Sequence, residues 1–596
     1  MAQTIEHVDL MVRSGDCLYR RDGLICSFVM AGSILLAQPF VEMGFIDDWS
    51  YIKTAQVFSQ TGHFVYNGWA TATLGWQVLW GALFARLFGF SFVHVRLSTL
   101  PVAMASIYLF HQILIRFGIS RPNAIFASLC LALSPVFMTM SESYMTDVPG
   151  MFCTLLCLYL CQRAISAVTD RARLGWLWLA MVTNVAGGTV RQTVWLGVLL
   201  MLPSAVWLLR SRRVVLWAGT LFWLIGVASV FAVMHWFNEQ PYFLVERIPV
   251  EVLTPAALKH TVLREFVLGS LASLSTLLLL LPVLTAWLPT ARSTSKRKVI
   301  WLFAIPSVLA AIFLANYGAH GALGKFGEFA PWLPHVMGGL IFPLGQWPRI
   351  IITAVVLSSS LAFFLDLWGR LRTHRQFENT HTPPWSHIFW LLIPYTVGFI
   401  GALIIRGLND IWFDRYLLIP QAVGIILLLR YYQEFVVRGN RAIRSVFRIG
   451  DFPAVSWLAL LTFAVIAVAG THDWFALFRA RLQAAEQVRR SGVPRTAIQG
   501  GLEYDGWTQL EVVGYVNDSR IQIPPDAFHA PPPSTIARPA CAVPWYSPSL
   551  FPAVDPQYFV VDAPMSCLER TPFSAISYST WMPPSRGKVY VQKRKN

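Results

Sequence analysis

Apolar runs alternate with short polar segments, many of them basic, along the first 470 residues of the chain. A bilayer core of about 30 Å needs roughly 20 residues of helix to cross it, so such runs predict membrane-spanning helices. We expect about thirteen, near residues 23–41, 92–115, 122–140, 148–162, 174–189, 193–209, 214–235, 263–288, 299–315, 350–369, 387–405, 416–433 and 453–470. The pattern therefore predicts an α-helical polytopic membrane protein.

Composition agrees with this class. Of the 596 residues, 55% are hydrophobic and only 13% are charged, whereas a soluble domain carries about 25% charged residues. A soluble enzyme, a disordered scaffold and a disulfide mini-protein are therefore excluded. The net charge of +16 comes from Lys and Arg residues grouped between the apolar runs. Such grouping is typical of membrane insertion rather than of a nucleic-acid-binding surface, so no nucleic-acid partner is expected.

The basic segments also predict an orientation. If all thirteen runs cross the membrane, these segments fall on one side, and the positive-inside rule assigns that side to the cytoplasm. The N-terminus is then cytoplasmic, in a multi-pass protein of the plasma (inner) membrane. We expect a transmembrane domain over residues 1–470, with a long first extracytoplasmic loop at 42–91 that contains two interfacial amphipathic helices. Residues 471–596 then form a small extracytoplasmic α+β domain, where Cys541 and Cys567 can pair in an oxidising compartment.

Four acidic residues lie near the predicted outer ends of the helices. Asp47 and Asp48 follow the first run, and Glu142 and Asp147 lie in a short loop between two later runs. Carboxylates near a low-dielectric region have raised pKa values and can accept protons in catalysis. Two plainer interpretations stay open: Asp47 and Asp48 as solvated loop residues, and Asp147 as the N-cap of the helix that follows it.

Two arginines interrupt apolar sequence on the same predicted side. Arg191 and Gln192 separate two runs, and Asp414, Arg415 and Tyr416 precede a later one. An Arg within a span costs about 2.5–3.5 kcal/mol, so an anionic partner is expected. That partner is either a phosphate, which guanidinium groups bind well, or a neighbouring aspartate: one of the acids above for Arg191, and Asp414 for Arg415. Together these residues suggest a site for an anionic substrate that approaches from the lipid.

The order of these motifs resembles a known family. A DD pair after the first helix, a long loop, TDVP before the fourth helix, an RQ pair, and DRYLLIP late in the chain resemble the GT-C polytopic glycosyltransferases. Within them the chain is most similar to the aminoarabinose-transferase and protein O-mannosyltransferase group, over about residues 20–435. One position departs from that group, which often has Asp-Glu where this chain has Asp47-Asp48.

The resemblance implies transfer of a sugar from a polyprenyl-phosphate-linked donor to a glycan, lipid or protein acceptor at the outer face, with inversion of the anomeric centre. It implies a general base at Asp47 and orienting roles for Asp48 and Asp147. The implied substrate-binding set comprises Arg191, Gln192, Arg415, Tyr416 and Glu142.

No cofactor is expected, and a divalent metal is not indicated. The cysteines that repeat along one helix, Cys153, Cys157 and Cys161, fit helix packing better than metal binding. Two other functions stay open: a transporter or flippase for a polar lipid or solute, and a glycopolymer ligase.

Overall fold

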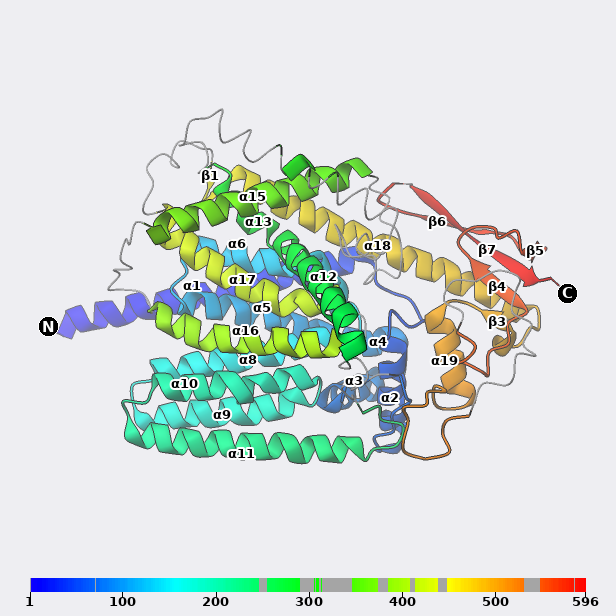
Figure 1. Cartoon of the computed structure of the whole chain (residues 1–596), viewed down its shortest axis with the longest axis horizontal. Coiled ribbons are helices and arrows are strands. Elements are labelled where there is room, and N and C mark those ends of the chain that lie inside the picture. Colours follow the sequence, from blue (N-terminus) through cyan, green and yellow to red (C-terminus); the bar gives the residue numbers. More distant parts are fainter. Residues whose placement is uncertain are drawn as a thin grey trace.

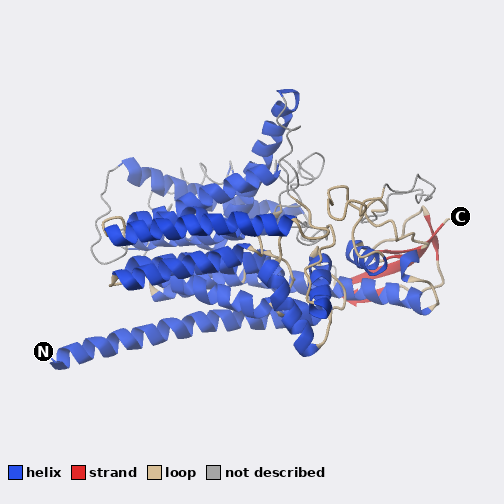
Figure 2. Ribbon diagram, turned by 90° about the horizontal axis from the view of Figure 1, so that it is seen from below, coloured by secondary structure: helices blue, strands red, loops and turns tan. Residues whose placement is uncertain are grey.

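The computed structural model describes residues 2–69, 71–245, 255–289, 305, 307–309, 312, 346–372, 384–407, 413–437, 448–529, 547–583 and 585–595. Most long helices run side by side in one bundle, with the N-terminus at one end of the molecule and the C-terminus at the other (Figure 1). The strands that follow residue 490 gather beyond the end of the bundle that is remote from the N-terminus (Figure 2). A helical bundle with a small sheet at one end is therefore the architecture of the described residues.

The helices follow the predicted apolar runs closely. Those of the first half are α1 (Ala2–Ala37), α2 (Asp48–Thr61), α3 (Gly75–Phe88), α4 (Phe92–Leu97), α5 (Thr99–Arg116), α6 (Arg121–Ala132), α7 (Pro135–Ser141), α8 (Asp147–Ser166), α9 (Asp170–Gly188), η1 (Gln192–Trp195), η2 (Gly197–Met201), α10 (Leu202–Leu208) and α11 (Arg213–Asn238). Those of the second half are α12 (Pro255–Leu279), α13 (Leu281–Leu284), η4 (Thr285–Trp287), α15 (Gln346–Arg372), α16 (Trp385–Gly407), η6 (Asp414–Leu417), α17 (Leu418–Tyr431), η7 (Tyr432–Val437), α18 (Ala454–Arg490), η9 (Arg495–Ala497) and α19 (Leu502–Val512).

The predicted number of spans is not reached among the described residues. Six of their helices are long and apolar enough to cross a membrane, or seven if the pair α6 and α7 forms one span. That pair is bent by 63°, at Pro135, where the ring cannot continue the preceding helix. Elsewhere the apolar runs are divided into short pieces, such as η1, η2 and α10 over Gln192–Leu208. The run predicted at 299–315 lies mostly outside the described residues.

The loop predicted at 42–91 contains the two expected helices, α2 and α3. Helix α2 begins with Asp48 in its first turn, where a negative charge is favoured by the helix dipole. It ends at Gly62, whose φ of +74° suits glycine. Helices α2 and α3 pack against each other near the end of the bundle where the strands lie (Figure 1).

The C-terminal sheet is formed by five strands: β3 (Ile498–Gln499), β4 (Tyr558–Val561), β5 (Leu568–Arg570), β6 (Ile576–Ser579) and β7 (Arg586–Arg594). Strand β7 is central to it, because β4, β5 and β6 all pair with β7 antiparallel, while β3 pairs with β4 in parallel. A two-stranded hairpin, β1 (Arg448–Ile449) and β2 (Phe452–Pro453), precedes α18. Helix α18 runs unbroken from Ala454 to Arg490 and packs against β6 and β7.

Helix α19 joins the sheet to the predicted first loop. Trp49 on α2 is fully buried, and its indole lies against Gly506 of α19 so closely that an added Cβ on Gly506 would be 2.7 Å from two ring carbons. Phe551 lies edge-on to Trp49, with ring centroids 5.9 Å apart. The C-terminal residues therefore hold the start of α2, which carries the paired acids.

Candidate active site

The two adjacent acids at the start of α2 have different environments. Asp48 is fully buried, and its carboxylate accepts hydrogen bonds from the backbone N–H groups of Phe45 (2.6 Å) and Tyr144 (3.2 Å). Its Oδ2 also lies 3.4 Å from Nε of Arg96. Burial raises the pKa of Asp48 to about 6, although the Arg96 charge opposes the rise. Asp48 therefore ties the loop before α2 to the segment before α8.

Asp47 faces a different set of partners. Its Oδ1 accepts a hydrogen bond from Nε1 of Trp69 at 3.1 Å, and its Oδ2 lies 3.2 Å from Nη2 of Arg415. The Asp47 side chain is 20% exposed, whereas that of Asp48 is completely covered. Of the pair, Asp47 is therefore the acid that a substrate can reach.

Arg415 connects Asp47 with a second acid from a distant part of the chain. Nε of Arg415 lies 3.8 Å from Oδ2 of Asp147, and Nη1 of Arg191 contacts the other oxygen of the same carboxylate. We call Asp47, Asp147, Arg191 and Arg415 the acid–arginine cluster. Of the two partners expected for Arg191, a phosphate or an aspartate, the structure shows an aspartate, Asp147. The contact described between Asp414 and Arg415 is a hydrogen bond from the backbone N–H of Arg415 to the Asp414 carboxylate, and it does not involve the Arg415 guanidinium.

The expectation that Asp147 is a helix N-cap is wrong. Helix α8 begins at Asp147 itself, the N-cap position is Thr146, and no side chain forms a capping hydrogen bond there. An acid in the first turn is still favoured by the helix dipole. Because its carboxylate is not used in a cap, Asp147 is available to the two arginines.

An aromatic ring lies beside the cluster. The Tyr416 ring centroid is 4.7 Å from the guanidinium carbon of Arg191, 5.6 Å from that of Arg406 and 5.7 Å from that of Arg415. Cations are attracted to such a ring face. With Arg406 counted, three arginines lie around Tyr416, whereas the acid–arginine cluster itself has two arginines and two carboxylates.

Two of the predicted substrate-binding residues lie elsewhere. Gln192 donates from Nε2 to the backbone oxygen of Thr71 at 2.6 Å, so it holds the loop before α3. Glu142 is buried, and neither of its carboxylate oxygens has a hydrogen-bond partner among the described residues. Burial raises the pKa of Glu142 well above its usual value, and the nearby charge of Arg96 opposes this. Glu142 thus belongs with Arg96 and Asp48, and its contact with substrate stays a prediction.

Several neighbours of the cluster were not predicted from the sequence as site residues. Trp69 binds Asp47, Arg96 pairs with Asp48, and Arg406 reaches Tyr416. Tyr51 lies close enough to the cluster that, besides burial, the charges of Asp47 and Asp147 raise its pKa while that of Arg415 lowers it. Arg96 could have been identified from the sequence, because an Arg in an apolar helix requires an anionic partner.

The C-terminal residues add a further acid near Asp47 and Asp48. Glu503 in the first turn of α19 is 8% exposed, and its Cβ would lie 3.3 Å from a Cβ added to Gly44. Burial raises the pKa of Glu503 to about 7. Arg481 opposes this rise, and the charges of Asp47 and Asp48 add to it. No sequence motif indicated that residues so far apart would meet.

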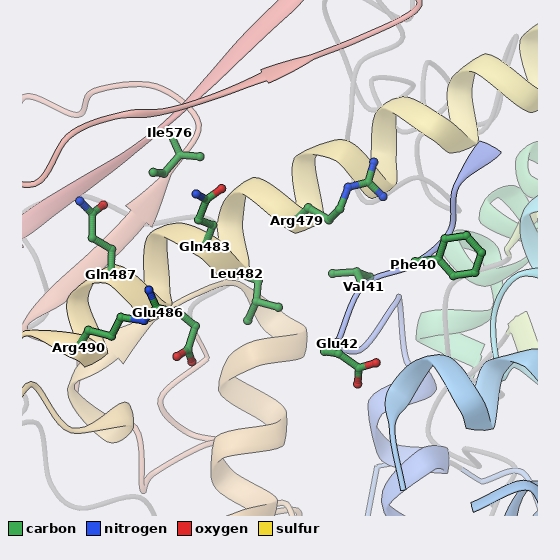
Figure 3. Close-up of a pocket in the computed structure, with 10 residues that line it drawn as sticks. All are labelled: Phe40, Val41, Glu42, Arg479, Leu482, Gln483, Glu486, Gln487, Arg490 and Ile576. Carbon is green, nitrogen blue, oxygen red and sulfur yellow. The ribbon is translucent and has the colours of Figure 1, made fainter. Parts of the chain in front are cut away.

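A separate cleft lies on the C-terminal half of α18. It has a volume of about 610 Å³, and Figure 3 shows the residues that line it. One wall is a single face of α18 from Arg479 to Arg490, and the others come from the segment after α1, Phe40 to Glu42, and from Ile576 of β6. None of the cleft residues belongs to the acid–arginine cluster, so the two features are distinct.

Metal-binding groups are not evident in the described part of the chain. No group of three or more His, Cys, Asp or Glu residues there is arranged to hold an ion. Cys153, Cys157 and Cys161 are buried, unpaired residues of α8. Cys567 is disulfide-bonded, and Cys541 lies outside the described residues.

Comparison with known proteins supports the resemblance seen in the motifs. Residues 78–237 match the family model described as dolichyl-phosphate-mannose-protein mannosyltransferase. This match confirms the resemblance to GT-C glycosyltransferases, and it runs from within α3 to near the end of α11, with Asp147 and Arg191 inside it. No curated protein matches the chain.

Three solved structures illustrate the fold neighbours. ArnT from Cupriavidus metallidurans in the apo state is 13% identical, with a TM-score of 0.35 over 83% of this chain and 84% of that chain. The Pmt1–Pmt2 protein O-mannosyltransferase complex of S. cerevisiae bound to the sugar donor is 13% identical, with a TM-score of 0.31 over 38% of this chain and 34% of that chain. Arabinosyltransferase EmbB from Mycobacterium smegmatis is 13% identical, with a TM-score of 0.33 over 76% and 41%. We draw no argument about the site from these superpositions.

Proposed function

We propose that this chain, a multi-pass membrane protein resembling the GT-C glycosyltransferases, is an inverting glycosyltransferase. Its donor is a sugar linked to a polyprenyl phosphate, and its acceptor is a glycan, lipid or protein at the outer face of the membrane. The single observation that supports this function best is the contact of Arg415 with both Asp47 and Asp147, while Arg191 contacts Asp147 from the other side.

Each residue of the cluster has a chemical role in the proposed reaction. Asp47 accepts the proton of the acceptor hydroxyl as its oxygen forms a bond to the anomeric carbon, a contribution of about 10²–10⁴-fold. The bond between that carbon and the phosphate oxygen breaks on the opposite face, so the configuration inverts. The departing lipid phosphate carries the electron pair and is stabilised by Arg191 and Arg415.

The ion pairs seen in the cluster support this division of roles. A guanidinium already held by one carboxylate is pre-oriented, and the Tyr416 ring restricts Arg191 further. When phosphate binds, Arg191 and Arg415 contact both the phosphate and the acids. Asp147 then orients the arginines, whereas Asp47, the more exposed acid of the first pair, remains accessible to the acceptor.

The outer-face location is supported by the basic segments of the sequence, which the positive-inside rule assigns to the cytoplasm. With that orientation, Asp47 and the C-terminal sheet lie outside. Helix α19, which packs against β3 of the sheet, contacts α2 through Gly506 and Trp49, which supports placing α2 and the sheet on the same side of the membrane.

The test uses the purified full chain in nanodiscs, with a panel of polyprenyl-phosphate-linked sugars and a membrane extract as acceptor source. Asp47→Asn is expected to lower sugar transfer by at least about 10²-fold while binding of undecaprenyl phosphate, followed by native mass spectrometry, is retained. Asp562→Asn is the matched control, because Asp562 is an exposed acid that pairs with Arg481 in the C-terminal part. Unchanged transfer by Asp47→Asn would reject Asp47 as the base. Loss of lipid movement across the membrane with transfer intact would favour a flippase.

A further inference from the structure

The turn between β6 and β7 is attached to α18 by a short polar contact. The Asp473 carboxylate accepts the backbone N–H groups of Trp581 (2.6 Å) and Met582 (2.9 Å). The Trp581 ring stacks on His472 with a centroid distance of 4.0 Å and an angle of 12°. Trp581 and Met582 therefore have a defined place on the helix, and Figure 1 shows the hairpin extending along α18 toward the helical bundle.

The attachment point coincides with the end of the apolar half of α18. Leu458, Leu461 and Val465 are each more than half exposed, as expected for side chains that face lipid. The apolar run ends at Gly470, and His472 follows two residues later, which is about 3 Å along the helix axis. The β6–β7 turn thus lies beside the end of the apolar run of α18.

The side chains of the turn and of the adjoining strand suit a bilayer surface. Trp581 is 48% exposed and Pro583 is also exposed, while Arg586 and Lys588 at the start of β7 are exposed cations. Tryptophan is enriched at the membrane–water interface because its ring is amphipathic. Lys and Arg close to the surface are attracted to anionic lipid head groups by about 1 kcal/mol each.

From this combination we infer that the β6–β7 turn is a membrane-surface anchor. Trp581 and Pro583 enter the head-group region of the leaflet on the side of the C-terminal sheet, and Arg586 and Lys588 bind anionic phospholipid head groups. Strand β6 also carries Ile576, which lines the cleft on α18, so the anchor fixes one wall of that cleft against the bilayer. This inference requires a membrane protein but not the proposed glycosyltransferase activity.

The test measures the depth of a spin label on the turn in the full chain. Pro583→Cys is labelled in nanodiscs of phosphatidylcholine and phosphatidylglycerol, and its collision rates with oxygen and with a water-soluble nickel chelate are compared. Glu569→Cys is the matched control, because Glu569 is exposed and far from the turn. It lies opposite Lys593 in the register of β5 and β7. Lys593 is seven residues along β7 from Arg586, which is about 23 Å. The unsubstituted chain gives the background from native cysteines.

We expect the label at 583 to meet oxygen at least threefold more often, relative to the chelate, than the label at 569. Equal ratios of oxygen to chelate collision rates at positions 583 and 569 would overturn the inference. Ser585→Cys, at a second exposed turn position, repeats the measurement in case the loss of Pro583 alters the turn. In the Arg586→Gln/Lys588→Gln variant, adding phosphatidylglycerol should no longer deepen the label. A persistent effect of phosphatidylglycerol would remove these two residues from the anionic contact.

Discussion

Arg415 and Asp47 form an ion pair, with Nη2 3.2 Å from Oδ2, although 368 residues separate them in the chain. The Arg415 side chain is only 7% exposed. An interaction between charges in such a site is stronger than at a water-exposed surface, and the loss of one partner leaves the other buried and uncompensated. The contact also joins η6 to the residue before α2, so it holds together two segments of the proposed active site that are distant in the chain.

Substitution of Arg415 is therefore expected to affect both stability and activity. Arg415→Met keeps the side-chain volume but removes the charge, and we expect a loss of about 3–5 kcal/mol in the free energy of unfolding together with loss of sugar transfer. Arg415→Lys keeps the charge without the bidentate geometry, so it should retain most stability and still transfer sugar poorly. Thermal unfolding and transfer assays on both variants check this. Full transfer by Arg415→Lys would contradict a phosphate-binding role.

The Trp69 hydrogen bond is expected to orient Asp47. Trp69→Phe removes the Nε1 donor, which lies 3.1 Å from Asp47 Oδ1, and retains an aromatic ring against Trp49, whose centroid is 4.9 Å away. A hydrogen bond to a charged group contributes about 1.5–3 kcal/mol, so transfer should fall by roughly 10–100-fold. A control is Trp457→Phe, because that indole donates only to the Ile449 backbone oxygen. Equal activity losses in the two variants would show that Trp69 acts through general stability.

Gly506 is expected to tolerate no larger side chain. A Cβ at this position would lie 2.7 Å from the Trp49 indole, and overpacking of this kind costs about 1–3 kcal/mol. Gly506→Ala should lower the unfolding temperature and also reduce transfer, because Trp49 follows the Asp47–Asp48 pair directly. Gly175→Ala is the control, since a Cβ there meets nothing within 4 Å. If the two substitutions have the same effect, the contact of α19 with α2 does not constrain the acids.

Glu503 gives a prediction about pH. Burial raises the pKa of Glu503 to about 7, so the folded state binds its proton more tightly than the unfolded state does. This contribution to stability is complete below about pH 4.5 and is lost as the pH rises through 7. Glu503→Gln should therefore leave stability almost unchanged at pH 4.5 and raise it by about 3 kcal/mol at pH 8. Thermal unfolding of both proteins across this range measures the difference. A destabilised variant at pH 8 would mean that the attraction between the Glu503 carboxylate and the Arg481 charge outweighs the cost of burial.

The apolar runs predicted the helices well because membrane-spanning helices need long uncharged sequence whatever their tertiary neighbours are. Among the described residues, fewer helices are long and apolar enough to span than the runs predicted, since hydropathy does not detect breaks such as that at Pro135 or the division of Gln192–Leu208 into short helices. Those breaks depend on local backbone geometry and on side-chain packing, which hydropathy does not describe.

The site was predicted in part for a similar physical reason. Arg191 and Arg415 interrupt apolar sequence, so an anionic partner could be inferred for each. Trp69 and Tyr51 have no such signal, because aromatic residues are common at membrane surfaces for reasons unrelated to catalysis. Glu503 is more than 450 residues from Asp47, and tertiary packing, including that of α19 on α2, brings the two regions together.

Helix α18 passes from the apolar bundle to the C-terminal sheet over 37 residues without interruption, a length of about 55 Å. A continuous helix transmits rotation along its axis, unlike a flexible linker. A tilt of the apolar N-terminal half of α18 is therefore expected to move the sheet, and α19 with it, in proportion. Through α19, we expect a change in the tilt of α18 within the bilayer to move the residues around Trp49 as well.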